Sequence, residues 1–355
     1  MKKLALLFTF FILISFLVSA TVRTVSNFPL NVAQYNDIQT AIGASASGDT
    51  VYVHGSPNNY AAFTIADSIT ILGPGWMPDK QLPFTAMVLG ITITNNAARG
   101  TEIHGLDFVG GGLNIATALT LNNIKIIRNH FRQGIPINFV GGAFGTYSGF
   151  LIEGNWFENS YITMYAAHAA INFIIHNNLF LDDAGYQQGV GGFMNASNIL
   201  VDHNLFYGGP YSVFPNSWYL LITNNIFVHR NASTANTSTF NNNITYLTPQ
   251  DAPWTVNGNS GINNLAATNP QMVDEAAVEA NNHSPILDFT IPSGPANNAG
   301  SDAKDIGLLY DVTGSLNWTN SRASRMPFIY SMNITTPTVA PGGNVSVTVE
   351  SRRNN

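Results

Sequence analysis

Alternating apolar and polar residues, closed by Asn-x-Phe, recur along the middle of the chain. Five copies of this eight-residue pattern occupy positions 124–131, 150–157, 173–180, 199–206 and 220–227. A weaker copy without the Asn ends at Phe108. Successive side chains of a β-strand point to opposite faces, so a period of two predicts a strand in each copy. The repeated Asn residues stand at 129, 155, 178, 204 and 225, which gives steps of 26, 23, 26 and 21 residues.

The length of the repeat predicts the architecture. Periods of roughly 20 to 50 residues indicate stacked supersecondary units. A helical repeat would place apolar residues at i, i+3 and i+4, and a leucine-rich repeat would follow L-x-x-L-x-L; the copies follow neither. We therefore predict an all-β fold, a parallel β-helix in which each repeat adds one rung. Three columns should face its interior, at five and three residues before the Asn and two residues after it.

The repeated Asn has a structural explanation. We expect it at the sharp bend after each strand, in the left-handed backbone conformation that Asn tolerates. Its amide both donates and accepts, so stacked Asn side chains can form a ladder parallel to the backbone hydrogen bonds. The sequence therefore predicts that these five residues are scaffold and not a binding site.

The N-terminal region differs from the repeats. Residues 1–20 combine two Lys with an apolar run and then small residues, which predicts a secretory signal peptide cleaved near Ala20 and a secreted or cell-surface protein. The apolar run has about 15 residues, fewer than the roughly 20 of a membrane-spanning helix, so no membrane span is predicted. Residues 21–46 are predicted as an extended lead-in and a capping helix, with Asn36 as N-cap.

The remaining boundaries follow from where the pattern persists and where it decays. The β-helix is predicted over residues 47–312. Residues 313–355 are predicted as a short β-rich C-terminal tail, with strands at 326–330 and 344–349.

The start of the repeat region carries a family resemblance. The motifs are Ile38-Gln-Thr-Ala-Ile42, then Gly48-Asp-Thr-Val-Tyr-Val53, then Ile69-Thr-Ile-Leu-Gly73. Together they resemble the opening of secreted bacterial right-handed parallel β-helix proteins of the pectate-lyase-like superfamily. The resemblance covers residues 35–312 and implies a right-handed β-helix with an N-terminal cap, but no particular activity.

The catalytic motifs of that superfamily are not carried over. The R-x-P-x-x-R of pectate lyases is absent from the repeats; Arg325-Met-Pro327 begins like it, but Tyr330 stands where the second Arg should be. Polygalacturonases use several carboxylates and a Gly-His-Gly; here Asp182-Asp183 is present and Gly-His-Gly is not. The resemblance therefore implies a fold without a reaction.

Composition narrows the class of partner. Charged residues are 10% of the chain, the formal net charge is −6, and there is no Cys. An acidic chain with few Lys is a poor binder of nucleic acid, so no nucleic-acid partner is predicted. A surface of Asn, Ser, Thr, Gly and Tyr suits hydrogen bonding to an uncharged polymer, and a polysaccharide is the predicted partner. No cofactor or metal is predicted; Ca²⁺ is chemically compatible with the carboxylates, but no specific motif supports it.

Outward-facing polar residues supply the candidate catalytic group. Glu153, His176 and Asp202 precede the Asn by two positions in successive repeats, and rungs about 4.8 Å apart would stack them into a ladder. Arg128 and His203 stand beside its ends. Such a ladder can perform acid–base chemistry or hold a cation, and it can equally be a mutually satisfied polar cluster with no reaction.

Candidate substrate-binding residues lie on the long segments that follow each Phe. A Tyr ring matches the apolar face of a pyranose, although Tyr is also an ordinary residue of solenoid turns. The candidates are Tyr161, Tyr165, Tyr186 and Tyr211. Arg132 is added because Lys125, Arg128 and Arg132 form a tight cationic cluster that could neutralise a uronate polymer.

An outward aliphatic row leaves a second function open. Four positions before the Asn stand Leu151, Ile174, Leu200 and Leu221. We expect loops or the 250–350 segment to cover this row; otherwise a protein partner docks there. Three hypotheses follow: a surface protein that binds, and in one version processes, a polysaccharide; a non-catalytic structural or adhesive solenoid; and a uronate-specific polysaccharide lyase.

Overall fold

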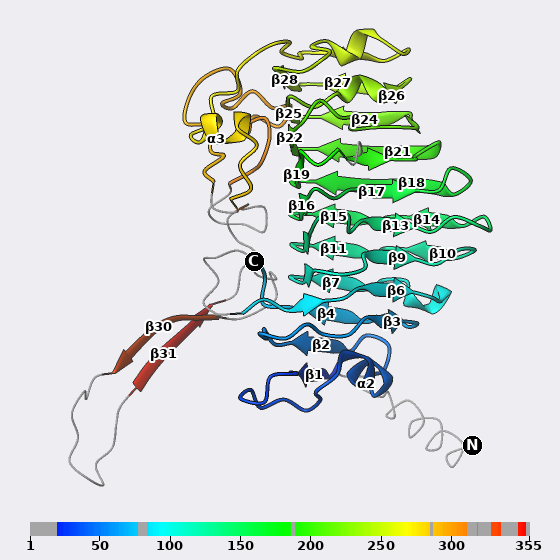
Figure 1. Ribbon diagram of the computed structural model, residues 1–355, viewed down its shortest axis with the longest axis vertical. Helices are drawn as coiled ribbons and strands as arrows, with labels where there is room; N and C mark the ends of the chain where they lie inside the picture. The colour runs from blue at the N-terminus through cyan, green and yellow to red at the C-terminus, as the bar shows by residue number, and fades with distance from the viewer. Residues whose placement is uncertain are drawn as a thin grey trace, which may run out of the picture.

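The computed structural model describes residues 20–76, 84–185, 189–284, 287–310, 318, 328–334 and 347–352. In these residues the chain forms the predicted all-β parallel solenoid (Figure 1). Three parallel sheets run along the stack; one spans it from the first rung to the last, and the other two span parts of it. Residues 1–19 of the predicted signal peptide lie outside the described residues.

The three sheets are built from strands that pair in parallel with the preceding and following rungs. Sheet A contains β1 (Val22–Val25), β2 (Thr50–Val53), β4 (Thr70–Leu72), β7 (Glu102–His104), β11 (Lys125–Ile127), β15 (Leu151–Glu153), β18 (Ala169–His176), β21 (Asn195–Asp202), β24 (Leu220–Thr223), β27 (Thr239–Asn241) and β29 (Ser260–Ile262), with β10 (Thr120–Asn122) and β14 (Thr146–Ser148) alongside. Sheet B contains β5 (Met87–Val88), β8 (Asp107–Phe108), β12 (His130–Phe131), β16 (Trp156–Glu158), β19 (Leu179–Asp182), β22 (Leu205–Gly208), β25 (Ile226–Val228) and β28 (Ile244–Tyr246). Sheet C contains β3 (Phe63–Ile65), β6 (Ile91–Ile93), β9 (Leu113–Ile115), β13 (Ile137–Phe139), β17 (Ile162–Met164) and β20 (Val190–Gly191). Two short strands, β23 (Ser217–Trp218) and β26 (Ala235–Asn236), pair separately.

The three predicted interior columns are confirmed. The aliphatic column three before the Asn is in direct register and fully buried: Ile126, Ile152, Ile175, Val201 and Ile222. The Phe column stacks ring on ring from Phe108 to Phe227, with adjacent centroids 4.4 to 5.1 Å apart. Each buried ring stabilises the fold by on the order of 1.5–3 kcal/mol, which is how a chain without disulfides stabilises its stack.

The Asn ladder is confirmed and is longer than predicted. Each side-chain amide donates to the Oδ1 of the Asn on the next rung, at 2.9 to 3.1 Å, from Asn129 through to Asn264. Asn243 and Asn264 add two rungs where the sequence pattern has already decayed. The regular ladder therefore extends beyond the recognisable repeat.

The predicted left-handed conformation falls on a different residue. The ladder Asn residues are not among those with positive φ; the residue before each of them is. This column consists of Gly105, Arg128, Gly154, Asn177, His203, Asn224, Asn242 and Asn263, with φ between 51° and 63°. A second left-handed column lies two residues before the outward aliphatic position of sheet A and includes Asn172, within β18, and Asn198, within β21. The strand is thus bent at both ends, and the ladder Asn follows the bend because its amide must point along the stack.

The only α-helix near the start of the described chain is α2 (Ile38–Gly43). Its N-cap is Asp37, whose carboxylate accepts from the backbone N–H of Thr40, and not Asn36 as predicted. Ile38 and Ala41 join the main core, and the helix lies at the β1 end of the stack (Figure 1).

After β29 the chain leaves the sheets and returns along the outside of sheet B. We call residues 265–309 the strap; it contains α3 (Glu275–Glu279) and lies beside β19 to β28 in Figure 1. Residues 270–308 fall within the predicted 47–312 range of the β-helix, but the described part of them (270–284 and 287–308) contributes no strand to the three sheets. Their apolar residues pack on the outer side chains of sheet B, which a strand pattern alone does not distinguish from inward packing.

The two predicted C-terminal strands form an antiparallel pair, β30 (Phe328–Ile334) and β31 (Val347–Arg352). Residues 326, 327 and 344–346 of the predicted strands lie outside the described residues. In the described part of the chain, no helix has the length and apolarity needed to cross a bilayer.

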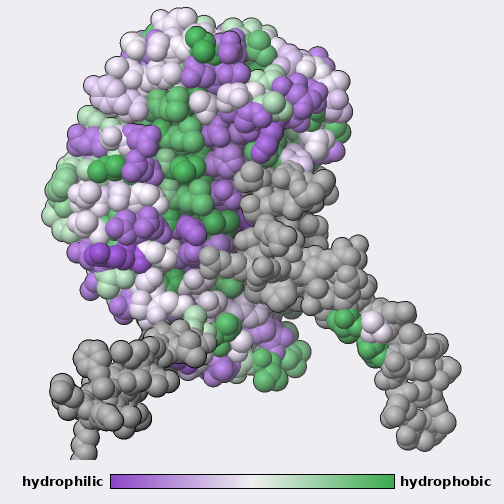
Figure 2. Space-filling model, turned by 180° about the vertical axis from the view of Figure 1, so that it is seen from behind, coloured by the Kyte–Doolittle hydropathy of each residue, from purple (hydrophilic) through white to green (hydrophobic). Residues whose placement is uncertain are grey.

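The outward aliphatic row is not covered by the described chain. The exposed fractions of Ile174 and Leu221 are 42% and 39%, and Leu151 and Leu200 are half-buried. Figure 2 shows a hydrophobic band running along the stack between hydrophilic bands. The expected intramolecular cover is therefore wrong for Ile174 and Leu221, because the strap packs on sheet B and not on sheet A.

Candidate functional site

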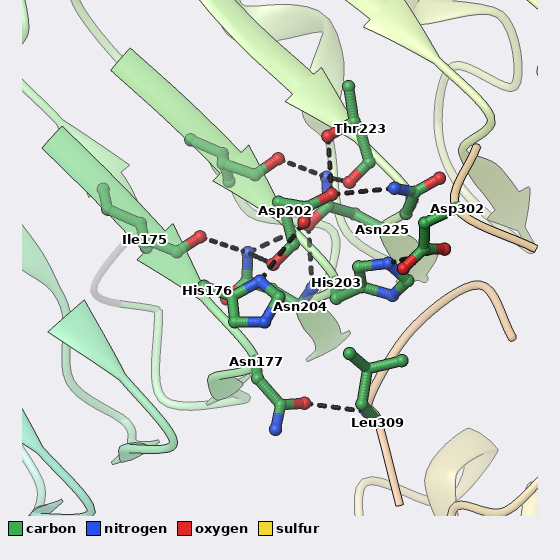
Figure 3. A network of polar contacts seen from close by, with 12 residues as sticks. Ile175, His176, Asn177, Asp202, His203, Asn204, Thr223, Asn225, Asp302 and Leu309 are labelled. Carbon is green, nitrogen blue, oxygen red and sulfur yellow. Dashed lines mark hydrogen bonds and ion pairs between the residues drawn. The ribbon is translucent and has the colours of Figure 1, made fainter. Parts of the chain in front are cut away.

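Glu153, His176 and Asp202 lie side by side on the outer face of sheet A. The parallel register pairs Glu153 with His176 and His176 with Asp202, and Thr223 follows on the next rung. Figure 3 shows the His176 ring directed at Asp202, with Nδ1 3.2 Å from Oδ2. The predicted placement is confirmed, whereas a catalytic role stays a proposal.

The Asp202 carboxylate is surrounded by donors. Thr223 Oγ1 donates to its Oδ1 at 2.6 Å, and Asn224 Nδ2 donates to the same oxygen at 2.8 Å. Burial alone would raise the pKa of Asp202, but the hydrogen bond from His176 and the other nearby donors and charges outweigh it and hold this pKa below its usual value. Asp202 is therefore a charged acceptor near neutral pH and not a proton donor.

Glu153 has the opposite electrostatic character. Burial raises the pKa of Glu153, and the charges of His176 and Arg128 only partly offset that effect. A carboxyl with a raised pKa beside an imidazole is an arrangement found at acid–base sites. Arg128 itself is buried, with only 3% of its surface exposed.

His203 faces the strap instead of solvent. Its Nδ1 lies 3.1 Å from the backbone O of Gly307, and its Nε2 lies 3.4 Å from Asp302 Oδ1. Burial lowers the pKa of His203, which favours the neutral ring. Asn177, in the same column, accepts from the backbone N–H of Leu309 at 2.8 Å (Figure 3). These two residues attach the strap to the stack.

A second chain of titratable groups, not predicted from the sequence, crosses the outer face of sheet B. It runs Asp107, His130, Glu158, His283, Asp183. Each imidazole lies between two carboxylates, with N···O distances of 2.9 to 3.2 Å. Four members belong to the solenoid, and His283 belongs to the strap.

The members of this chain stabilise one another's charged forms. Burial disfavours each charge, but the hydrogen bonds between carboxylates and imidazoles, together with the hydrogen bonds from Arg132 to Asp107, outweigh it. The pKa values of Asp107, Glu158 and Asp183 consequently lie below the usual range, and those of His130 and His283 lie above it.

The predicted cationic cluster is committed to internal contacts. Arg132 donates through Nε and Nη2 to both oxygens of Asp107, at 2.9 and 2.7 Å. Lys125 Nζ donates to Glu102 at 3.0 Å. With Arg128 buried, the three cations do not form a common surface for a substrate carboxylate.

Part of this group of linked carboxylates and imidazoles on sheet B could have been predicted from the sequence. Asp107 and His130 stand one residue after the ladder position, and Glu158 three residues after it. The later rungs of these columns carry aliphatic or aromatic residues, from Trp156 to Ile244 in the first and from Leu181 to Tyr246 in the second. A charge in an otherwise apolar column was the available clue. His283 could not be placed this way, because it lies outside the repeats and reaches the site only through the path of the strap.

A hollow of about 310 Å³ opens on the outer face of sheet C. Asn138, Thr163, Tyr165, Met194 and Asn216 are among its lining residues. The Tyr165 side chain is 46% exposed, so its ring is available to a ligand. The hollow therefore combines an uncovered aromatic surface with amide and hydroxyl groups. Of the predicted binding residues that the structure describes, Tyr165 is the one that lines it.

The other predicted Tyr residues lie elsewhere. Tyr161 is half-buried, and Tyr211 is half-buried against Gly185 and Gly209. Tyr186 lies outside the described residues. The candidate Tyr residues therefore do not form one continuous surface among the residues that the structure describes.

Among the described residues, no group of three or more His, Asp or Glu side chains is arranged to hold a metal ion. The sequence matches no protein-family model, and a search of the curated proteins gives no match. The class of this protein, a parallel β-solenoid, therefore follows from its fold.

Proposed function

We propose that this chain is an exported β-solenoid that binds an extracellular polysaccharide in the hollow on sheet C. The observation that carries the proposal is the exposed Tyr165 ring beside the amides of Asn138 and Asn216 and the hydroxyl of Thr163. A pyranose has an apolar face that packs on an aromatic ring and hydroxyls that bond to amides, so this combination suits a sugar. The sequence of residues 1–20 supports export.

The hollow supports binding more than cleavage. Its lining residues are Asn, Phe, Gly, Thr, Met, Tyr, Ala and Pro, and none of them is an acid or a base in the neutral range. Glycoside cleavage needs a positioned proton donor and a second carboxylate. A processing activity would have to use another surface, and the Glu153–His176–Asp202 ladder on sheet A is the proposed location.

Glycan binding is tested on the intact protein with an oligosaccharide array followed by calorimetry. Tyr165→Ala should weaken the affinity about tenfold, which corresponds to about 1.4 kcal/mol. Tyr219→Ala is the matched control, because Tyr219 is 60% exposed but does not line the hollow. Absence of binding to every glycan at millimolar concentration, or equal losses for both variants, would contradict the proposal.

Docking of a protein partner on the aliphatic row is a second candidate function. The observation in its favour is the exposure of Ile174 and Leu221 on adjacent parts of one face. Ile174→Lys with Leu221→Lys should abolish such docking in a pull-down while leaving glycan binding unchanged. The uronate-lyase alternative is less well supported, because Lys125 and Arg132 are paired internally.

A further inference from the structure

The strap is held on sheet B by apolar packing. Met272, Val278, Phe289, Ile291 and Leu308 are buried in one cluster with the outer side chains of sheet B. Figure 1 shows this segment, including α3, running beside the stack. Apolar packing of this kind does not depend on pH, so any pH dependence must come from the polar contacts.

Apart from the contact between His203 and Asp302, the polar contacts of the last part of the strap with the solenoid are made by amide and hydroxyl groups. Asn242 Nδ2 donates to the backbone O of Ala299 at 3.0 Å, and the backbone N–H groups of Gly307 and Leu309 donate to Asn224 and Asn177 at 2.8 Å. These groups do not titrate. Burial favours the neutral His203 ring, which donates one N–H to the same segment.

The middle of the strap is attached differently. His283 Nδ1 lies 2.9 Å from Glu158 Oε1, and His283 Nε2 lies 3.0 Å from Asp183 Oδ2. A protonated imidazole donates from both nitrogens and satisfies both carboxylates. A neutral imidazole has one N–H, so its other nitrogen would present a lone pair to a carboxylate. The geometry is therefore complete only with the imidazolium.

We propose that His283 is a protonation-dependent clasp: its imidazolium holds residues 270–284 on the solenoid, and loss of that proton releases them while residues 299–309 stay attached. The groups that face His283 are Glu158 of β16 and Asp183 after β19. Next to it, the Tyr207 hydroxyl of β22 donates to the backbone O of Asn282 at 2.8 Å. Release uncovers the apolar outer face of sheet B beneath α3.

The direction of the pH effect follows from the sign of the His283 shift. Two carboxylates raise the pKa of His283 above its usual 6.5, against the opposing effect of burial. The clasp is therefore closed below pH 6.5 and opens as the pH rises through the raised pKa. His130 also lies between carboxylates, but both of its partners, Asp107 and Glu158, belong to the solenoid, so its titration breaks no contact with the strap.

The test is amide hydrogen exchange from pH 5.5 to 9, expressed as protection factors corrected for the intrinsic rate. Protection of peptides within 270–284 should fall by up to about tenfold per pH unit between pH 6.5 and the raised His283 pKa and level off above it, because one proton is linked to opening. Peptides from 195–206 and 299–309 should keep constant protection. His283→Gln should give low protection of 270–284 with no further fall above pH 7; a fall below pH 7 belongs to Glu275, because burial raises its pKa to about 7. His229→Gln, a histidine outside the clasp, should behave as the wild type.

A flat profile in the wild type, or an unchanged slope in His283→Gln, would overturn the clasp. If His283→Gln also lowers protection of 195–206, the variant has unfolded and Asp183→Asn takes its place. The amide introduced there can donate to a neutral imidazole, so protection of 270–284 should persist at high pH. A wild-type slope in Asp183→Asn would equally overturn the proposal.

Discussion

Arg230 and Asp182 form an ion pair that is wholly enclosed by the stack. Arg230 Nη1 lies 2.9 Å from Asp182 Oδ2, and the side chains are 0% and 2% exposed. Arg230 also donates to the backbone O atoms of Asp182 and Ser212. The Arg230 guanidinium thus links the rung that contains Asp182 to the rung that contains Ser212, where the sheet B strands end.

Arg230→Met should therefore destabilise the protein by about 3–5 kcal/mol, because it leaves the Asp182 carboxylate buried without its cation. Chemical denaturation measures the loss. Arg99→Met is the control, since Arg99 is exposed, and its effect should stay within about 0.5 kcal/mol. Similar losses in the free energy of unfolding for both variants would show that the buried ion pair stabilises the protein no more than an exposed arginine does.

The Asn ladder should be costly to interrupt in the middle. Asn204→Ala removes the acceptor of the Asn178 N–H and the donor to the Ile175 carbonyl, both of them buried. Each stranded group costs about 1–3 kcal/mol, so we expect a loss of roughly 2–5 kcal/mol in urea denaturation. Asn195→Ala, at an exposed Asn of the same β21 strand, should cost far less.

The linked carboxylates and imidazoles on sheet B predict a pH range in which the protein is most stable. The pKa values of Asp107, Glu158 and Asp183 are lowered, so their stabilisation is present at neutral pH and lost as the pH falls through those values. The pKa values of His130 and His283 are raised from 6.5, so their stabilisation is lost as the pH rises through the raised values.

Melting temperatures should consequently be highest in mildly acidic solution, between the carboxyl range and pH 6.5, and fall on both sides. Glu158→Gln removes the carboxylate shared by His130 and His283 and should flatten the alkaline side. If the melting temperature of this variant still falls at alkaline pH as in the wild type, the fall is caused by groups other than His130 and His283.

The hollow on sheet C can be altered without touching Tyr165. A Cβ on Gly141 would lie 2.8 Å from Tyr165 Cδ2, so Gly141→Ala must move the ring. Because Tyr165 is exposed, the ring can shift at little cost in stability, and we expect a several-fold loss of glycan affinity with a nearly unchanged melting temperature. Gly43→Ala is the control, since a Cβ there meets no atom within 4 Å.

Any hydrolytic or lyase activity should depend on the sheet A ladder. Glu153→Gln and Asp202→Asn should each abolish turnover of a polysaccharide that the protein binds, with glycan affinity retained because the hollow is on sheet C. Turnover assays and calorimetry on the same preparations separate the two effects. Full activity in both variants would locate the chemistry elsewhere.

The repeat itself was sufficient to predict the solenoid, its interior columns and the Asn ladder. Residues such as Ile175, Phe180 and Asn178 are selected by the rung above and the rung below, so their roles are visible as columns in the sequence. The same register placed His176 beside Asp202, because parallel pairing transfers spacing along the chain into spacing along the stack.

Only the tertiary structure determines the features that depend on the path of the chain outside the repeat. The sequence does not say that the strap returns along sheet B, and therefore does not say that His203 is buried under it or that His283 reaches Glu158 and Asp183. Nor does it say that the sheet A row stays exposed. Local periodicity determines pairing between adjacent rungs, whereas contacts between residues 100 or more positions apart depend on which outer face an apolar segment covers.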